Sequence, residues 1–159
     1  MTDKISIVQV IQLMLAPGLM ISACGLLLLG MNNKYSLVVN RIRLLNEEKR
    51  KFFSKAGEKN LHYEENIRLE SISMQIKELG MRVKLVKNAV LADTIAVAFF
   101  VLTSLFIGLD FVTGSENFNI IVTLLFLAGM ILVLIGVIFA AYETKKGYEI
   151  IRLEVKVDE

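Results

Sequence analysis

Three long runs of predominantly apolar residues restrict the fold of this chain more than any other feature. The first extends over residues 5–31 and the third over residues 119–142, and neither contains a charged side chain. The second, residues 89–109, contains one charge, Asp93, near its start. About 20 predominantly apolar helical residues cross a hydrocarbon core roughly 30 Å thick. Each run is therefore long enough to span a membrane.

The composition agrees with a membrane class. Apolar residues make up 55% of the 159 residues, and the mean hydropathy is +0.59. A soluble chain of this length cannot bury so much apolar surface. The first run is longer than the apolar core of a cleaved signal peptide, and Asp3 and Lys4 before it give little positive bias. We therefore expect an all-α membrane protein in which all three runs are retained as transmembrane helices.

The distribution of Lys and Arg predicts the orientation of these helices. Thirteen of the 18 basic residues lie in residues 32–88 and four in residues 143–159, whereas the loop at residues 110–118 has none. Basic residues are enriched on the cytoplasmic side of membrane proteins. The segment 32–88 and the tail 143–159 are therefore expected in the cytoplasm, and the N-terminus and the loop 110–118 outside.

The cytoplasmic segment 32–88 has the pattern of a helical hairpin. A polar stretch at residues 54–60 reads as a turn. Apolar residues of the second arm alternate steps of three and four, which predicts a coiled-coil seam. These residues are Leu69, Ile72, Ile76, Leu79, Val83, Val86 and Val90. The partner is either the first arm, giving a long antiparallel pair, or another subunit. No proline separates either arm from its span, so each arm should continue its transmembrane helix.

Several local motifs together resemble a bacterial family of small membrane proteins known only as a domain of unknown function. They are Ala16-Pro17 in the first span, Asn32-Asn33-Lys34 at its exit, Gln75-Ile76 followed by Leu85-Val86-Lys87-Asn88-Ala89 before the second span, and Glu143 after the third. The resemblance covers nearly the whole chain. It implies a three-span protein of the bacterial inner membrane and brings no established activity or catalytic residue.

Small and polar residues of the first span are candidates for a pore lining or a helix interface. They are Gln9, Gln12, Ala16, Pro17, Gly18 and Ser22. Amide side chains are costly in lipid unless they find partners, and small residues let helices approach closely. Proline removes a backbone hydrogen bond, which makes it either a gating hinge or a static kink.

Asp93 is the one ionisable residue within a span and is a candidate ion or proton site. The alternative is a carboxylate at the headgroup level, paired with a nearby lysine such as Lys87. His62 and Cys24 have no metal-ligand spacing, and no nucleophile–base or phosphate-binding motif is present. The sequence thus predicts no metal, no cofactor, no nucleic-acid partner and no enzymatic activity.

Two main functions remain open. Three spans are too few to enclose a conduit, so a channel requires self-association in a ring, with the first span along the axis. Alternatively, the protein is a non-conducting membrane scaffold whose cytoplasmic coiled-coil hairpin binds a protein partner. A transporter centred on Asp93 is a weaker third hypothesis, because the chain lacks further intramembrane charges.

Overall fold

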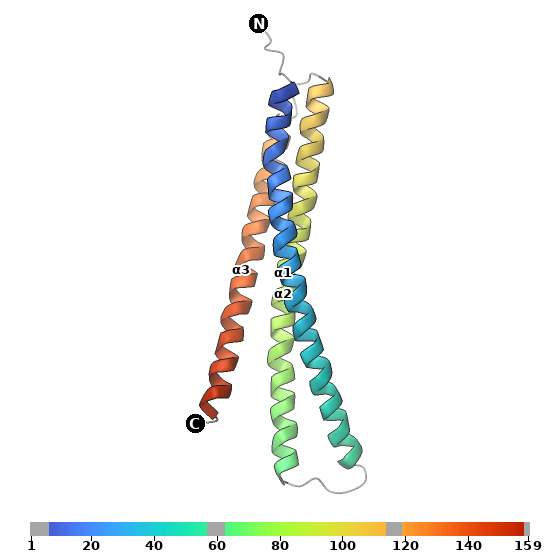
Figure 1. The fold of residues 1–159 in the computed structure, drawn as a ribbon, viewed down its shortest axis with the longest axis vertical. Helices are drawn as coiled ribbons and strands as arrows, with labels where there is room; N and C mark the ends of the chain where they lie inside the picture. The colour runs from blue at the N-terminus through green and yellow to red at the C-terminus, as the bar shows by residue number, and fades with distance from the viewer. Residues whose placement is uncertain (1–6, 57–62, 114–118, 158–159) are drawn as a thin grey trace. The chain divides into compact units, whose positions relative to one another are not determined.

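The computed structural model describes residues 7–56, 63–113 and 119–157, and all of these residues are helical. Helix α1 is Ile7–Ala56, α2 is Tyr63–Thr113 and α3 is Asn119–Val157 (Figure 1). Each helix contains a segment long and apolar enough to cross a membrane. The prediction of an all-α chain with three long apolar helices is therefore confirmed. Of the predicted turn at residues 54–60, the first part belongs to α1, and residues 57–60 lie outside the described part.

Neither α1 nor α2 is interrupted where its apolar span meets its charged arm. Helix α1 continues through Asn32 and Asn33, and α2 continues through Lys87 and Asn88. Helix α1 also continues through Pro17, although proline removes one intrahelical hydrogen bond. The prediction that both arms continue their transmembrane helices is confirmed by these helix bounds.

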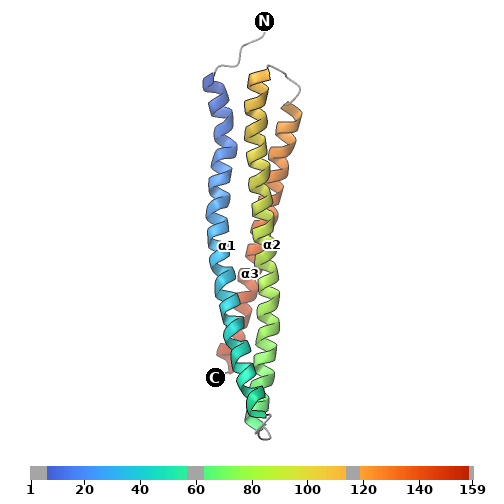
Figure 2. The same ribbon diagram turned by 90° about the vertical axis from the view of Figure 1, so that its right-hand side faces the viewer.

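The described residues form two compact units, each with a segment of all three helices. The apolar unit comprises residues 7–31, 88–113 and 119–139, and the charged unit comprises residues 32–56, 63–87 and 140–157. In the apolar unit the three segments lie side by side in both ribbon views (Figures 1 and 2).

The core of the apolar unit is narrow. Cys24 of α1 packs with Ala96 and Phe100 of α2, and all three are fully buried. The rings of Phe100 and Phe126 of α3 have centroids 5.6 Å apart. A methyl group at Gly129 of α3 would stand 2.8 Å from the Phe100 ring, so this glycine is needed for the ring to pack there. Most other apolar side chains are exposed, as expected for helices surrounded by acyl chains.

Buried residues follow a heptad spacing along α1 and α2. In α1 they recur at every seventh residue, at Val10, Pro17, Cys24, Met31, Val38 and Leu45. In α2 they alternate steps of three and four over Val86, Ala89, Asp93, Ala96, Phe100 and Thr103. Each of these two helices therefore has one narrow buried seam.

The residues predicted to form the coiled-coil seam of the second arm differ in their burial. Ile72 and Val86 are buried, whereas Leu69, Ile76, Leu79 and Val83 are half-buried. At the next position the structure buries Ala89 completely and leaves Val90 half-buried. The small alanine side chain lets a neighbouring helix approach more closely than valine would.

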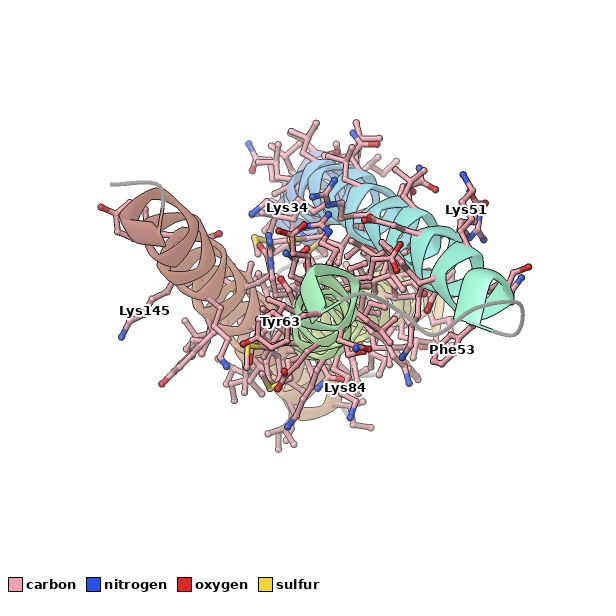
Figure 3. All side chains as sticks on the ribbon, turned by 90° about the horizontal axis from the view of Figure 1, so that it is seen from below. Lys34, Lys51, Phe53, Tyr63, Lys84 and Lys145 are labelled. Carbon is pink, nitrogen blue, oxygen red and sulfur yellow. The ribbon has the colours of Figure 1, made fainter. Side chains whose placement is uncertain are left out.

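The charged unit holds its lysines mainly on its outer surface. Lys51 of α1, Lys84 of α2 and Lys145 of α3 are exposed (Figure 3). An exposed ion pair joins the charged segments of α1 and α2. Arg68 Nε of α2 donates to Glu48 Oε1 of α1 at 3.0 Å.

Candidate functional site

One buried carboxylate in the charged unit binds cations from two other helices. Glu143 of α3 follows the charge-free run of the third span and is only 1% exposed. Arg82 Nη2 of α2 lies 2.6 Å from Glu143 Oε1, and Lys34 Nζ of α1 lies 3.0 Å from Oε2. Each carboxylate oxygen thus has a charged donor from a different helix. We call these three residues the Glu143 cluster.

The Glu143 cluster is supported by small and polar groups of α3. A Cβ atom at Gly147 would stand 3.0 Å from Arg82 Nη2, so glycine leaves room for the guanidinium group. Lys34 Nζ also donates to Thr144 Oγ1 at 3.0 Å, and that hydroxyl donates to the Ala140 carbonyl at 3.0 Å. Both cations are therefore held in place by α3.

Two opposing effects act on the protonation of Glu143. Burial raises the pKa of its carboxyl group, and the hydrogen bonds and charges of Arg82 and Lys34 lower it. The cations prevail, and the pKa of Glu143 lies below its usual value. The carboxylate is therefore ionised at neutral pH, and the Glu143 cluster joins three helices electrostatically.

The second buried carboxyl group, Asp93 of α2, lies in the apolar unit and is 2% exposed. Its Oδ1 atom has no hydrogen-bond partner among the residues that the structure describes. Gly136 of α3 faces it so closely that a Cβ atom there would overlap Oδ1 and stand 2.9 Å from the carboxyl carbon. Asp93 therefore points toward α3.

Threonine hydroxyl groups of the second span donate hydrogen bonds within their own helix. Thr94 donates to the Val90 carbonyl at 2.7 Å, and Thr103 donates to the Phe99 carbonyl at 2.8 Å. Such back-bonding is open to Ser and Thr because their side chains reach the preceding turn and carry a donor. An ionised aspartate has no proton to donate, so it cannot satisfy itself in this way.

The candidate residues of the first span divide between two faces of α1. Pro17 is buried on the seam of α1. The other five are exposed: Gln9, Gln12, Ala16, Gly18 and Ser22. The Ser22 hydroxyl donates to the Gly18 carbonyl at 3.2 Å, within the helix. The structure therefore separates Pro17 from the polar and small residues with which the sequence grouped it.

Cys24 and His62 are the other residues that the sequence singled out. Cys24 is a buried core residue beside Ala96 and Phe100, as expected for a small side chain facing a neighbouring helix. His62 lies outside the described part of the chain. Within residues 7–56, 63–113 and 119–157, no three His, Cys, Asp or Glu side chains are grouped as metal ligands would be.

Sequence reasoning did not identify the Glu143 cluster or the role of Gly136 as functional features. One available signal was the spacing on α3, because Gly129, Gly136 and Glu143 follow one another at seven-residue intervals. All three are buried and lie on the same face of the helix. Two glycines followed by a buried acid at heptad spacing mark the face of α3 that packs on α2.

Comparisons with known proteins agree with the family resemblance of the sequence motifs. No curated protein and no solved structure gives a significant match to the chain. The model of one family, described as "Protein of unknown function (DUF2721)", matches residues 14–153. Because this match covers most of the chain, the protein belongs to the DUF2721 family.

Proposed function

We propose that this protein is a subunit of a homo-oligomeric channel of the bacterial inner membrane, with α1 along the conducting path. The observation that carries the proposal is an exposed stripe on α1, next to its buried seam. In the apolar unit this stripe consists of Gln9, Ala16, Ala23 and Gly30, one at every seventh residue. We call it the α1 stripe. A lipid-facing surface favours large apolar side chains, whereas this stripe is small and polar.

A second subunit is the occupant that fits the α1 stripe. Ala16, Ala23 and Gly30 allow the backbone of a neighbouring helix to approach closely. Gln12 is also exposed, and its amide is costly in lipid but not at a water-filled path or against a polar neighbour. Repeating one such contact around an axis gives a closed ring. The α1 helices of the ring would then surround the path.

The proposed topology places the charged unit in the cytoplasm as an antiparallel hairpin. Glu48 and Lys34 of α1 have the same separation in sequence as Arg68 and Arg82 of α2, in opposite order. Glu48 pairs with Arg68, while Lys34 and Arg82 share Glu143. This matching order supports antiparallel arms. The bias of Lys and Arg supports their cytoplasmic location, with the N-terminus outside.

Conductance is expected to depend on the glutamines of α1. Purified protein reconstituted in planar bilayers should give discrete single-channel currents, and Gln12→Leu or Gln9→Leu should change their amplitude because each replaces an amide near the path with an apolar group. Leu15→Ile changes an exposed residue without altering polarity and serves as the control. A bilayer that stays tight around an intact oligomer would contradict the channel and favour the scaffold.

Crosslinking provides a separate test of the α1 stripe as a subunit interface. Native Cys24 is buried inside its own subunit, so it should not crosslink. In a Cys24→Ala background, Ala23→Cys should give dimers under oxidation in membranes, because position 23 would face a neighbouring subunit. Leu26→Cys in the same background is the matched control, since Leu26 is exposed outside the stripe. Equal dimer yields at both positions would argue against a specific interface.

The scaffold alternative is favoured by exposed apolar residues in the charged unit. Leu37 and Leu44 continue the heptad spacing of the α1 stripe and are 70% and 59% exposed. Ile67 and Met74 of α2 are also exposed and seven residues apart. Exposed apolar side chains that form a contiguous patch commonly mark a protein contact. Under this alternative, a cytoplasmic protein partner covers them and the spans serve as the anchor.

A further inference from the structure

Asp93 lies in an apolar environment formed by all three helices. Its own helix contributes the buried residues Ala89, Ala92 and Ala96 around it. Gly136 of α3 lies against its carboxyl group, and Cys24 of α1 is near enough for an electrostatic interaction. The carboxyl group is therefore almost fully buried, with a glycine of α3 against it and buried alanines beside it on its own helix.

Among the described residues of the apolar unit, no cation is available to balance an ionised Asp93. The described segment of α3 in the apolar unit, residues 119–139, contains no charged residue, and neither does the segment of α1. On α2, Lys87 is exposed, and Asp110 has the same sign of charge as Asp93. An unpaired ionised carboxylate in an apolar interior is one of the most costly groups to bury. Uptake of a proton removes that cost.

We propose that Asp93 is an intramembrane proton-binding site, held as the neutral carboxylic acid while the three helices are packed. Gly136 leaves the room that the acid needs at the α2–α3 contact. Release of the proton produces a carboxylate that requires water or a cation beside it, whereas Asp93 is only 2% exposed in the packed helices. Proton exchange at Asp93 is therefore coupled to separation of α3 from α2. This inference does not depend on whether the assembly conducts.

A proton fits this site better than a metal ion does. Calcium and magnesium require about six to eight oxygen ligands. Asp93 supplies one carboxyl group, Gly136 lies against it, and the buried residues nearest to it along α2 include Ala89, Ala92 and Ala96. No three acidic, His or Cys side chains gather there among the described residues. A single carboxyl group in an apolar enclosure is sufficient to bind one proton.

Labelling with dicyclohexylcarbodiimide tests the proposal, because this apolar reagent reacts with protonated carboxyl groups that are shielded from water. The purified protein in detergent at neutral pH should gain one adduct per chain, which mass spectrometry should map to Asp93. The adduct should be lost in Asp93→Asn and decrease as the pH is raised. Asp110→Asn should retain it. Infrared spectra should show the carbonyl band of a protonated acid that is absent in Asp93→Asn.

Three results would overturn the proposal. One is a folded wild-type protein that gains no adduct at Asp93 and shows no acid carbonyl band. Another is an infrared spectrum in which Asp93→Asn removes a carboxylate band at neutral pH, since Asp93 would then be ionised. The third is protection from labelling by Na⁺, K⁺ or Mg²⁺ at constant pH, which would assign the site to a cation. Circular dichroism and gel filtration verify that Asp93→Asn keeps the fold.

Discussion

Replacing Glu143 with glutamine is expected to lower the free energy of unfolding by about 3 kcal/mol. Removing one member of a buried ion pair typically costs about 3–5 kcal/mol, because the remaining charges lose their partner. We expect the lower end of that range because the side chains of Arg82 and Lys34 remain 23% and 44% exposed and are partly hydrated. Thermal or denaturant unfolding of the protein in detergent, followed by circular dichroism, measures the difference.

The matched control for this substitution is Glu48→Gln. Glu48 and Arg68 form a carboxylate–guanidinium pair like that of Glu143 and Arg82. However, both Glu48 and Arg68 side chains are substantially exposed. Exposed ion pairs contribute about 0–1 kcal/mol, so the control should change stability by no more than that. Equal and small effects of both substitutions would show that the Glu143 cluster does not hold the three helices together.

The second large effect is expected from Gly136→Ala. The added methyl group would overlap Oδ1 of Asp93, and that buried side chain has little space in which to move. Overpacking of a buried contact typically costs about 1–3 kcal/mol. We therefore expect a loss of stability of that size, measured by the same unfolding experiment.

Two variants separate this contact from a general effect of losing a glycine. Gly108→Ala is the control, because a Cβ atom at Gly108 meets nothing within 4 Å. It should leave stability nearly unchanged. The double variant Gly136→Ala/Asp93→Ala should recover most of the loss, since the shortened side chain at position 93 leaves room for the methyl group. A double variant as unstable as Gly136→Ala alone would contradict the proposed contact.

The secondary structure of this protein could be predicted from the sequence because its signals are local. Charge-free runs such as residues 119–142 identify the apolar segments. The absence of proline around Met31 and around Val90 predicts continuous helices. Both features depend on neighbouring residues only, and the helix bounds of α1 and α2 confirm them.

The buried charges could not be predicted in the same way, because they depend on the relative rotation of separate helices. Lys34, Arg82 and Glu143 are far apart in sequence, and each alone reads as a solvated charge near the end of a span. Pro17 shows the same limit. Pro17 follows Ala16 directly in the sequence. Successive residues of a helix are turned by about 100°, so Ala16 lies on the exposed stripe and Pro17 on the buried seam.

The heptad spacing of burial in α1 also restricts how this chain can change in length. Its buried residues lie on one side of the helix from Val10 to Leu45. A single residue inserted after Cys24 would turn every later residue by about 100°, which would carry Met31, Val38 and Leu45 away from the interior. An insertion of seven residues would nearly restore the phase. Substitutions along α1 are therefore local changes, whereas insertions and deletions are tolerated mainly in whole heptads.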